Sequence, residues 1–184
     1  MRVLGVDPGL TRCGLGIVET GAGRSVSLIS VSVATSSPEA ETPDRLVLIA
    51  DAIDAAIDRH RPDAVAVERV FAQHNVRTVM GTAQVSGLVM VAARRRGLPV
   101  ALYTPSEVKA AVSGSGRADK AQVGFMVAKL LGLDAVPAPA DAADSLAIAL
   151  THALRYSATP GAGTATTTAQ RTWAEAERAA RRRG

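Results

Sequence analysis

Four acidic residues lie at the ends of apolar stretches, where a carboxylate is costly to bury. Asp7 and Glu68 each end an apolar run, and Asp141 and Asp144 open a mostly apolar segment that reaches Leu150. An ionised carboxylate buried without a partner costs several kcal/mol, so such groups are usually paired with a cation or bound to a metal ion. No Lys or Arg adjoins Asp7, Asp141 or Asp144 in the sequence. A divalent cation is therefore the favoured counter-charge if the four side chains converge.

These residue types suit the hydrolysis of a phosphodiester by two metal ions. In that chemistry one ion activates a water molecule and the other stabilises the leaving oxygen. Carboxylate oxygens favour Mg²⁺ or Mn²⁺ over Zn²⁺. We therefore expect the same four residues to be catalytic and to bind Mg²⁺, with about two ions per active site and with Mn²⁺ as a substitute.

Each acidic residue also has a simpler explanation. Asp7 precedes Pro8 and Gly9 and could form a turn, and Glu68 could pair with the arginine that follows it. That pairing is geometrically poor, because adjacent side chains of a strand point to opposite faces. Asp141 and Asp144 could cap the start of a helix. Each explanation suffices alone, and it is the joint occurrence that favours a shared site.

The elements that would position these residues alternate between strands and helices. Turn signals separate predicted strands over 2–7, 13–19 and 26–33, and buried strands are expected at 64–68 and 98–103. Apolar spacing and helix-start signals predict helices over 43–59, 75–96 and 119–131, one that starts at 104–107, and a last one ending near 156. This order predicts an α/β fold with a five-stranded mixed sheet flanked by helices, compatible with a ribonuclease H-like layout.

The predicted strands and helices place the four acidic residues where they could form one site. Asp7 and Glu68 fall at the carboxyl ends of strands, where open α/β sheets bind their ligands. Asp141 and Asp144 are three residues apart in a helix, so they share a face. Their place in its first turn favours the ionised form, because the amino end of a helix carries partial positive charge.

Length and charge indicate one domain followed by a basic tail. The chain has 184 residues, of which 47% are hydrophobic and 3% aromatic, so a core of Ala, Val, Leu and Ile is expected. Residues 157–184 carry +3 of the net charge of +4. We expect a nuclease domain over 1–156 and a disordered basic tail over 157–184. The nearly neutral domain would bind a polyanion through local basic patches.

The sequence shows no sign of export or of membrane insertion. It lacks the pattern of a signal peptide, and its longest apolar stretch is too short to cross a bilayer. Its single cysteine, Cys13, excludes an internal disulfide framework and fits a reducing compartment. We expect a cytoplasmic protein that has no membrane partner.

Four segments resemble the signatures of RuvC-type Holliday junction resolvases. They are Asp-Pro-Gly-Leu-Thr-Arg-Cys-Gly at 7–14, Glu-Arg-Val-Phe at 68–71, Gly-Thr-Ala-Gln-Val-Ser-Gly at 81–87 and Asp-Ala-Ala-Asp-Ser-Leu-Ala-Ile-Ala at 141–149. The likeness covers about residues 1–156. It implies a ribonuclease H-like fold and a homodimeric, Mg²⁺-dependent endodeoxyribonuclease. Such an enzyme resolves Holliday junctions by symmetric paired nicking, leaving 5′-phosphate and 3′-hydroxyl ends, in DNA recombination and repair.

The resemblance also implies roles for individual residues. The four acidic residues match the catalytic positions of the family. Phe71 matches an aromatic residue that stacks on bases near the junction point, which contributes roughly 1–3 kcal/mol, although a place in the core is its alternative. Lys109 and Lys120 match basic positions near the scissile phosphate. His152 is expected to be structural rather than catalytic.

The implied partners are four-way junction DNA, a second copy of the chain, and the branch-migration proteins RuvA and RuvB. A twofold dimer supplies two equivalent sites for two cuts, and the small residues of 81–87 are the expected interface. Two other functions stay open. One is a relative that acts on structured RNA, and the other is an actin-like nucleotide-binding module, because Asp7 and Gly9 also resemble its phosphate loop. That module needs a second such loop and usually a longer chain, and neither occurs here.

Overall fold

Five strands form one mixed sheet in the part of the chain that the computed structural model describes, residues 1–22, 25–70 and 76–158. The strands are β1 (Arg2–Asp7), β2 (Arg12–Thr20), β3 (Val26–Thr35), β4 (Ala64–Glu68) and β5 (Val100–Tyr103). Their order across the sheet is β3-β2-β1-β4-β5. The first three pair antiparallel, whereas β1, β4 and β5 run parallel. This is the predicted mixed sheet.

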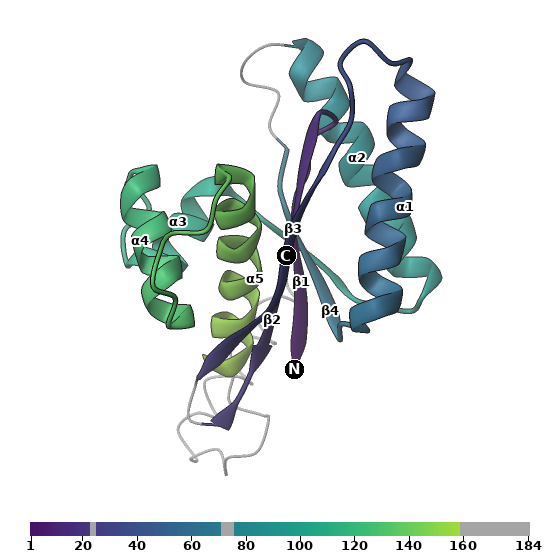
Figure 1. Cartoon of the computed structure of the whole chain (residues 1–184). Helices are drawn as coiled ribbons and strands as arrows, with labels where there is room; N and C mark the ends of the chain where they lie inside the picture. The colour runs from purple at the N-terminus through teal and green to yellow at the C-terminus, as the bar shows by residue number, and fades with distance from the viewer. Residues whose placement is uncertain (23–24, 71–75, 159–184) are drawn as a thin grey trace, which may run out of the picture.

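Helices cover both faces of the sheet (Figure 1). One face carries α1 (Thr42–His60) and α2 (Val76–Arg95), and the other carries α3 (Pro105–Ser113), α4 (Lys120–Leu131) and α5 (Ala140–Ala158). Each layer has its own core: Ile49 and Ile53 of α1 share one with Val65, and Leu146 of α5 shares the other with Val3. The predicted fold class is confirmed.

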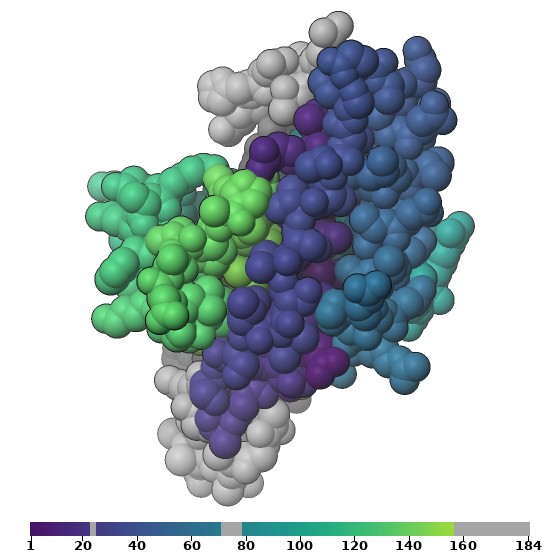
Figure 2. All heavy atoms as spheres, in the orientation of Figure 1, coloured from purple at the N-terminus to yellow at the C-terminus, as the bar shows by residue number. Residues whose placement is uncertain are grey.

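The edge strand β3 runs along the surface between the two helical layers (Figure 2). Its residues alternate between half-buried and exposed over much of its length, as expected for a strand with one solvated face. By contrast, β1 and β4 lie inside the sheet, and their central residues are buried. The strands that end in Asp7 and Glu68 are thus interior strands with buried centres.

Strand alternation directs both strand carboxylates towards α5. On β1, Val3 belongs to the α5-side core and Gly5 lies directly under α5, so Asp7 falls on the same face. On β4, Ala66 belongs to that core as well, and Glu68 follows it by two residues. The layer formed by α3, α4 and α5 therefore covers the face from which both carboxylates project.

Glycines let α5 lie directly against the backbone of β1 and β2. A Cβ atom at Gly14 would overlap the main-chain oxygen of Asp141, and one at Gly5 would overlap that of Ser145. Neither glycine has a positive φ, so the close approach, and not the backbone conformation, requires glycine. The contact at Gly14 fixes the first turn of α5 against the sheet.

Gly14→Ala should destabilise the fold by about 3 kcal/mol, because the added methyl group meets a backbone atom that cannot rotate away. Gly21→Ala is the matched control: there the nearest atom is the hydroxyl oxygen of Ser25, which can turn aside. Urea denaturation of both variants measures the difference. Equal unfolding free energies for the two would show that α5 can shift away from β2 at little cost.

Where the sequence predicted the first or last residue of a strand or helix, the observed boundary lies within two residues of it. The fifth strand begins at Val100 and not at 98, because Pro99 has no N–H group for the strand ladder. Of the predicted tail, residues 159–184 lie outside the described part of the chain. No helix in the described ranges is both long and apolar enough to cross a membrane.

Candidate active site

Two of the four acidic residues stand side by side at the carboxyl ends of parallel strands. Asp7 is the last residue of β1, and Glu68 is the last residue of β4. Val6 lies opposite Val67 in the parallel register, so the two acidic residues that follow are neighbours. Hydrophobic strands thus carry two carboxylates to the same point of the sheet edge.

The first two turns of α5 supply the other two carboxylates, with Asp141 alone in the first turn that was predicted for both. Asp141 is half-buried, as is Asp144 one turn later. Together with the strand ends they border a cavity of about 370 Å³. The charged side chains that line it are Asp7, Glu68, Lys109, Lys120, Asp141 and Asp144. The structure therefore brings together all four acidic residues and both lysines that the sequence singled out.

The strand carboxylates are electrostatically strained. Burial first, and then the negative charges of Glu68, Asp144 and Asp141, together raise the pKa of Asp7 to about 7 against the opposing charge of Lys120. The pKa of Glu68 is also raised, first by burial and then by Asp144. Neither carboxylate accepts a hydrogen bond from any residue of the described ranges. A positive charge placed between them would relieve this strain.

The helix carboxylates, by contrast, are each paired with a cation. Arg12 donates from Nε to Asp141 at 2.7 Å, and Lys120 donates from Nζ to Asp144 at 3.0 Å. The contact with Asp144 raises the pKa of Lys120. Both pairs are partly exposed to solvent, so each contributes little to stability and can open at low cost.

Arg12 is a site residue that the sequence did not reveal. The absence of a basic neighbour in the sequence suggested that the acidic residues lack a protein counter-charge, whereas Arg12 meets Asp141 from 129 positions away. A signal was present, because Arg12 and Gly14 are two residues apart on β2 and so share the face that meets α5. The pairing of Arg12 with Asp141 can be predicted from this spacing only once α5 is known to cover β2.

The donor set fits Mg²⁺ chemically, although the side chains do not form a finished metal site. Among the described residues no three acidic, His or Cys side chains are arranged to hold an ion as they stand. Four carboxylates around one cavity are nonetheless the oxygen ligands that Mg²⁺ prefers. Asp7 and Glu68 have no cation in contact among the described residues, whereas Asp141 and Asp144 each give one oxygen, Oδ2, to an ion pair.

The remaining predicted site residues have different outcomes. Lys109 lines the cavity without an ion pair to any described residue. Phe71 lies outside the described residues, so its predicted stacking role stays a prediction. His152 contacts Tyr103 and does not line the cavity, which agrees with the structural role expected for it.

Comparison with known proteins decides the family. A family model described as "Crossover junction endodeoxyribonuclease RuvC" matches residues 3–152. The chain belongs to the RuvC family. The RuvC of Saccharopolyspora erythraea is 64% identical over 155 residues, covering 84% of this chain and 78% of the relative. The RuvC of Paenarthrobacter aurescens is 58% identical over 186 residues, covering 100% of this chain and 98% of the relative.

Solved RuvC structures have the same fold. Thermus thermophilus RuvC in complex with its Holliday junction substrate matches with a TM-score of 0.80 and 39% identity, over 85% of this chain and 94% of that one. The yeast mitochondrial Holliday junction resolvase Ydc2 matches with a TM-score of 0.59 over 84% of this chain and 80% of that one. Its 16% identity shows a shared fold alone. The expected ribonuclease H-like architecture of RuvC is thereby confirmed.

Proposed function

We propose that this chain resolves four-way DNA junctions by symmetric paired nicking, through metal-dependent hydrolysis that leaves 5′-phosphate and 3′-hydroxyl ends. One observation carries the proposal: carboxylates from three separate segments of a RuvC-family chain line a single cavity. Burial and mutual repulsion raise the pKa of the two that come from strands. Carboxylates clustered in this way can bind divalent cations beside a reacting phosphate.

Each acidic residue has a defined part in this proposal. Asp7 and Glu68 would hold Mg²⁺ first, because they have no competing cation within hydrogen-bonding distance among the described residues. Asp141 and Asp144 would join after releasing Arg12 and Lys120. The bound ions, about two per site, would activate the attacking water and stabilise the leaving oxygen, and Mn²⁺ would substitute for Mg²⁺.

The basic and aromatic residues would place the DNA. Lys109 lines the cavity beside the carboxylates, where its compact charge suits the phosphate next to the scissile bond. Lys120, once released from Asp144, would do the same. Phe71, which follows β4 by three residues, would stack on bases at the junction point.

Cleavage assays on matched substrates test the proposed function. The chain is incubated in Mg²⁺ with a four-way DNA junction, a linear duplex of the same sequence and a structured RNA, and the cut positions are mapped. We expect paired cuts at symmetric positions in two strands of the junction. Faster cutting of the RNA than of the junction would favour the RNA-acting alternative. Cutting of the linear duplex as fast as the junction would show that the chain does not select junctions.

We further propose that the chain acts as a homodimer that pairs through α2. Met80, Gly87 and Val91 form one stripe along this helix, and the exposed fractions of Met80 and Val91 are 56% and 49%. A Cβ atom added at Gly87 would meet nothing within 4 Å in the single chain. An apolar stripe with a small residue at its centre suits the close approach of an identical helix.

Gly87→Leu tests this interface. The single chain has room at Gly87, so the fold should remain, whereas a leucine in the middle of the interface should raise the dimer dissociation constant by about tenfold or more. Ala121→Leu is the control, because Ala121 is exposed on α4, in the other helical layer. Sedimentation velocity measures both. Unchanged association of Gly87→Leu would place the interface elsewhere.

Two expectations remain predictions. The family implies that RuvA and RuvB would deliver junctions to the dimer, and co-purification with each protein tests this. The cytoplasmic location was predicted from the sequence, which shows no signal-peptide pattern and has a single cysteine.

A further inference from the structure

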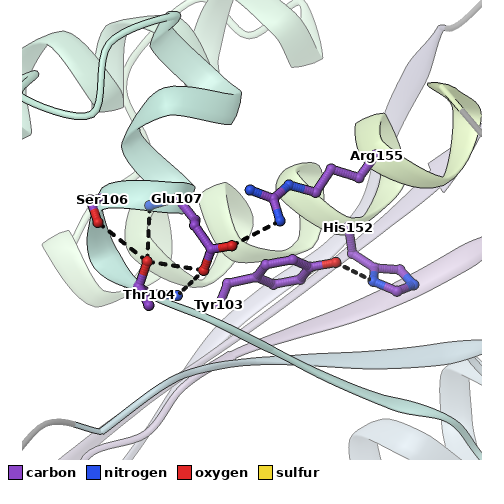
Figure 3. A network of polar contacts seen from close by, with 6 residues as sticks. All are labelled: Tyr103, Thr104, Ser106, Glu107, His152 and Arg155. Atoms are coloured by element: carbon purple, nitrogen blue, oxygen red, sulfur yellow. Dashed lines mark hydrogen bonds and ion pairs between the residues drawn. The ribbon is translucent and has the colours of Figure 1, made fainter. Parts of the chain in front are cut away.

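The junction between β5 and α3 is tied to the second half of α5 by side chains that do not line the cavity. Figure 3 shows this network, in which Tyr103 faces His152 of α5, Glu107 faces Arg155 of α5, and Thr104 contacts Glu107. The proposed chemistry gives none of these residues a part. The network nevertheless connects two elements that each carry residues of the cavity.

Two polar contacts and two contacts to aromatic rings connect β5 and α3 with α5. The hydroxyl of Tyr103 lies 2.8 Å from Nδ1 of His152, and their rings meet edge to face at 6.0 Å. The guanidinium of Arg155 lies 5.0 Å from the centre of the Tyr103 ring. Arg155 also pairs with Glu107 at 3.1 Å. Tyr103 therefore packs between two residues of α5, one turn apart.

The protonation states agree with this arrangement. Burial lowers the pKa of His152 and raises that of Tyr103. At neutral pH both groups are therefore uncharged, and the tautomer of the imidazole sets which of the two donates the hydrogen bond that they share. The side chain of Tyr103 is part of the α5-side core and His152 is half-buried, so their hydrogen bond is partly shielded from water.

Glu107 links the start of α3 to α5 through its two oxygens. Oε2 accepts hydrogen bonds from the backbone N–H of Thr104 at 2.8 Å and from its hydroxyl at 3.0 Å, while Oε1 pairs with Arg155. The Thr104 hydroxyl in turn accepts from the N–H of Glu107, which completes a capping box. One carboxylate thus fixes where α3 begins and where it stands against α5.

Both ends of the network lie close to the cavity. Tyr103 is the strand partner of Glu68, and its carbonyl oxygen accepts a hydrogen bond from the N–H of the next residue, Arg69, at 2.7 Å. On α3, Lys109 comes two residues after Glu107 and lines the cavity. On α5, His152 follows Asp144 by eight residues, about two turns of the helix.

We propose that Tyr103, Glu107, His152 and Arg155 form a positioning latch that holds α3, and with it Lys109, in register with the carboxylates of α5. These four are positioning residues and do not touch the substrate. The inference rests on the proposed function, because Lys109 is the group that it places. Lys109 has no ion pair to a described residue, so the backbone of α3 must set its reach. Misplacing a catalytic-site group by about 1 Å can cost about 100-fold in rate.

Glu107→Gln is the sharpest test, because glutamine at this position can still complete the capping box but cannot form the ion pair. We expect single-turnover cleavage of a saturating junction to slow by about tenfold, with little change in junction affinity or thermal unfolding. Arg155→Gln should act similarly, and Arg155→Lys should recover part of the rate. Glu19→Gln is the matched control, since it removes another Glu–Arg pair of 3.1 Å, at the opposite end of β2.

The Lys109→Ala background shows whether the latch acts through Lys109. There, Glu107→Gln should cause no further loss of rate. A tenfold loss that persists in that background, a wild-type rate for Glu107→Gln, or a rate loss that follows thermal stability would each overturn the latch. A native chain that does not cut the junction would contradict the proposed function itself, which is a different outcome from failure of the latch.

Hydrogen exchange tests the latch without any cleavage assay. Glu107→Gln should speed the exchange of amides in 105–113 while those of 141–147 keep their native rates. The control Glu19→Gln should change neither segment. Native exchange rates throughout α3 in Glu107→Gln would show that the ion pair does not hold this helix.

Discussion

Asp7→Asn should abolish cleavage of a four-way junction and leave the junction bound. Asparagine keeps the shape of the side chain but removes the negative charge that would hold Mg²⁺ beside Glu68. The expected loss is about 1000-fold in single-turnover rate, which corresponds to about 4 kcal/mol of transition-state stabilisation. Gel-shift binding in the presence of Ca²⁺ should stay near native, because Lys109 and Lys120 are untouched.

The same substitution should stabilise the fold, which separates loss of chemistry from loss of structure. The pKa of Asp7 rises from 3.8 to about 7 in the folded chain, so the ionised side chain opposes folding. This penalty develops as the pH rises from about 4 to about 7 and is fully present at pH 8. Asp7→Asn should therefore unfold at a higher urea concentration than the native chain at pH 8, and the difference should shrink towards pH 4.

Asp51→Asn on the exposed surface of α1 is the control for Asp7→Asn and should change neither rate nor stability. Cleavage by Asp7→Asn at the native rate would rule out Asp7 as a metal ligand. A stable variant that no longer binds the junction would instead assign Asp7 to DNA recognition.

Removal of Mg²⁺ should stop cleavage completely and reversibly, and the concentration that restores it should depend on pH. If Asp7 holds the ion as proposed, protons compete for the same carboxylate, because its pKa is raised to about 7. Below that pH the carboxyl group is mostly neutral and binds the ion weakly. The half-saturating Mg²⁺ concentration should therefore be about tenfold higher at pH 6 than at pH 8.

The measurement is a Mg²⁺ titration of single-turnover cleavage at both pH values after chelation. Binding of Mn²⁺, followed by electron paramagnetic resonance, gives the same comparison without catalysis. The native chain is its own control at pH 8 and pH 9, where Asp7 is ionised and the requirement should hardly change. An equal requirement at pH 6 and pH 8 would mean that Asp7 does not compete for protons at the metal site.

Local sequence patterns predicted much of this fold. The apolar runs before Asp7 and Glu68 are buried strands, and their acidic ends are neighbours. The spacing of Asp141 and Asp144 places both in the first turns of α5 beside the same cavity. These predictions succeeded because strand burial and helical spacing depend on residues close in sequence.

The contacts between distant segments could not be predicted in the same way. Arg12 meets Asp141 because glycines bring α5 onto β2, and this approach depends on the whole sheet. His152 was expected to be structural, but its partner Tyr103 lies 49 residues away on another element. Pairing between remote side chains follows from tertiary packing, which no local periodicity encodes.

The backbone contact between α5 and the strands beneath it bears on how freely this protein can change. The distance between the helix and Gly14 is set by main-chain atoms and not by the size of interdigitating side chains. On the opposite face of the sheet, Ile49 and Ile53 of α1 and Val89 of α2 belong to the other core and take no part in that spacing. Libraries of substitutions in the core beneath α1 and α2 should therefore yield many variants whose stability is altered but whose active-site geometry is native. That core is the place to engineer a higher unfolding temperature.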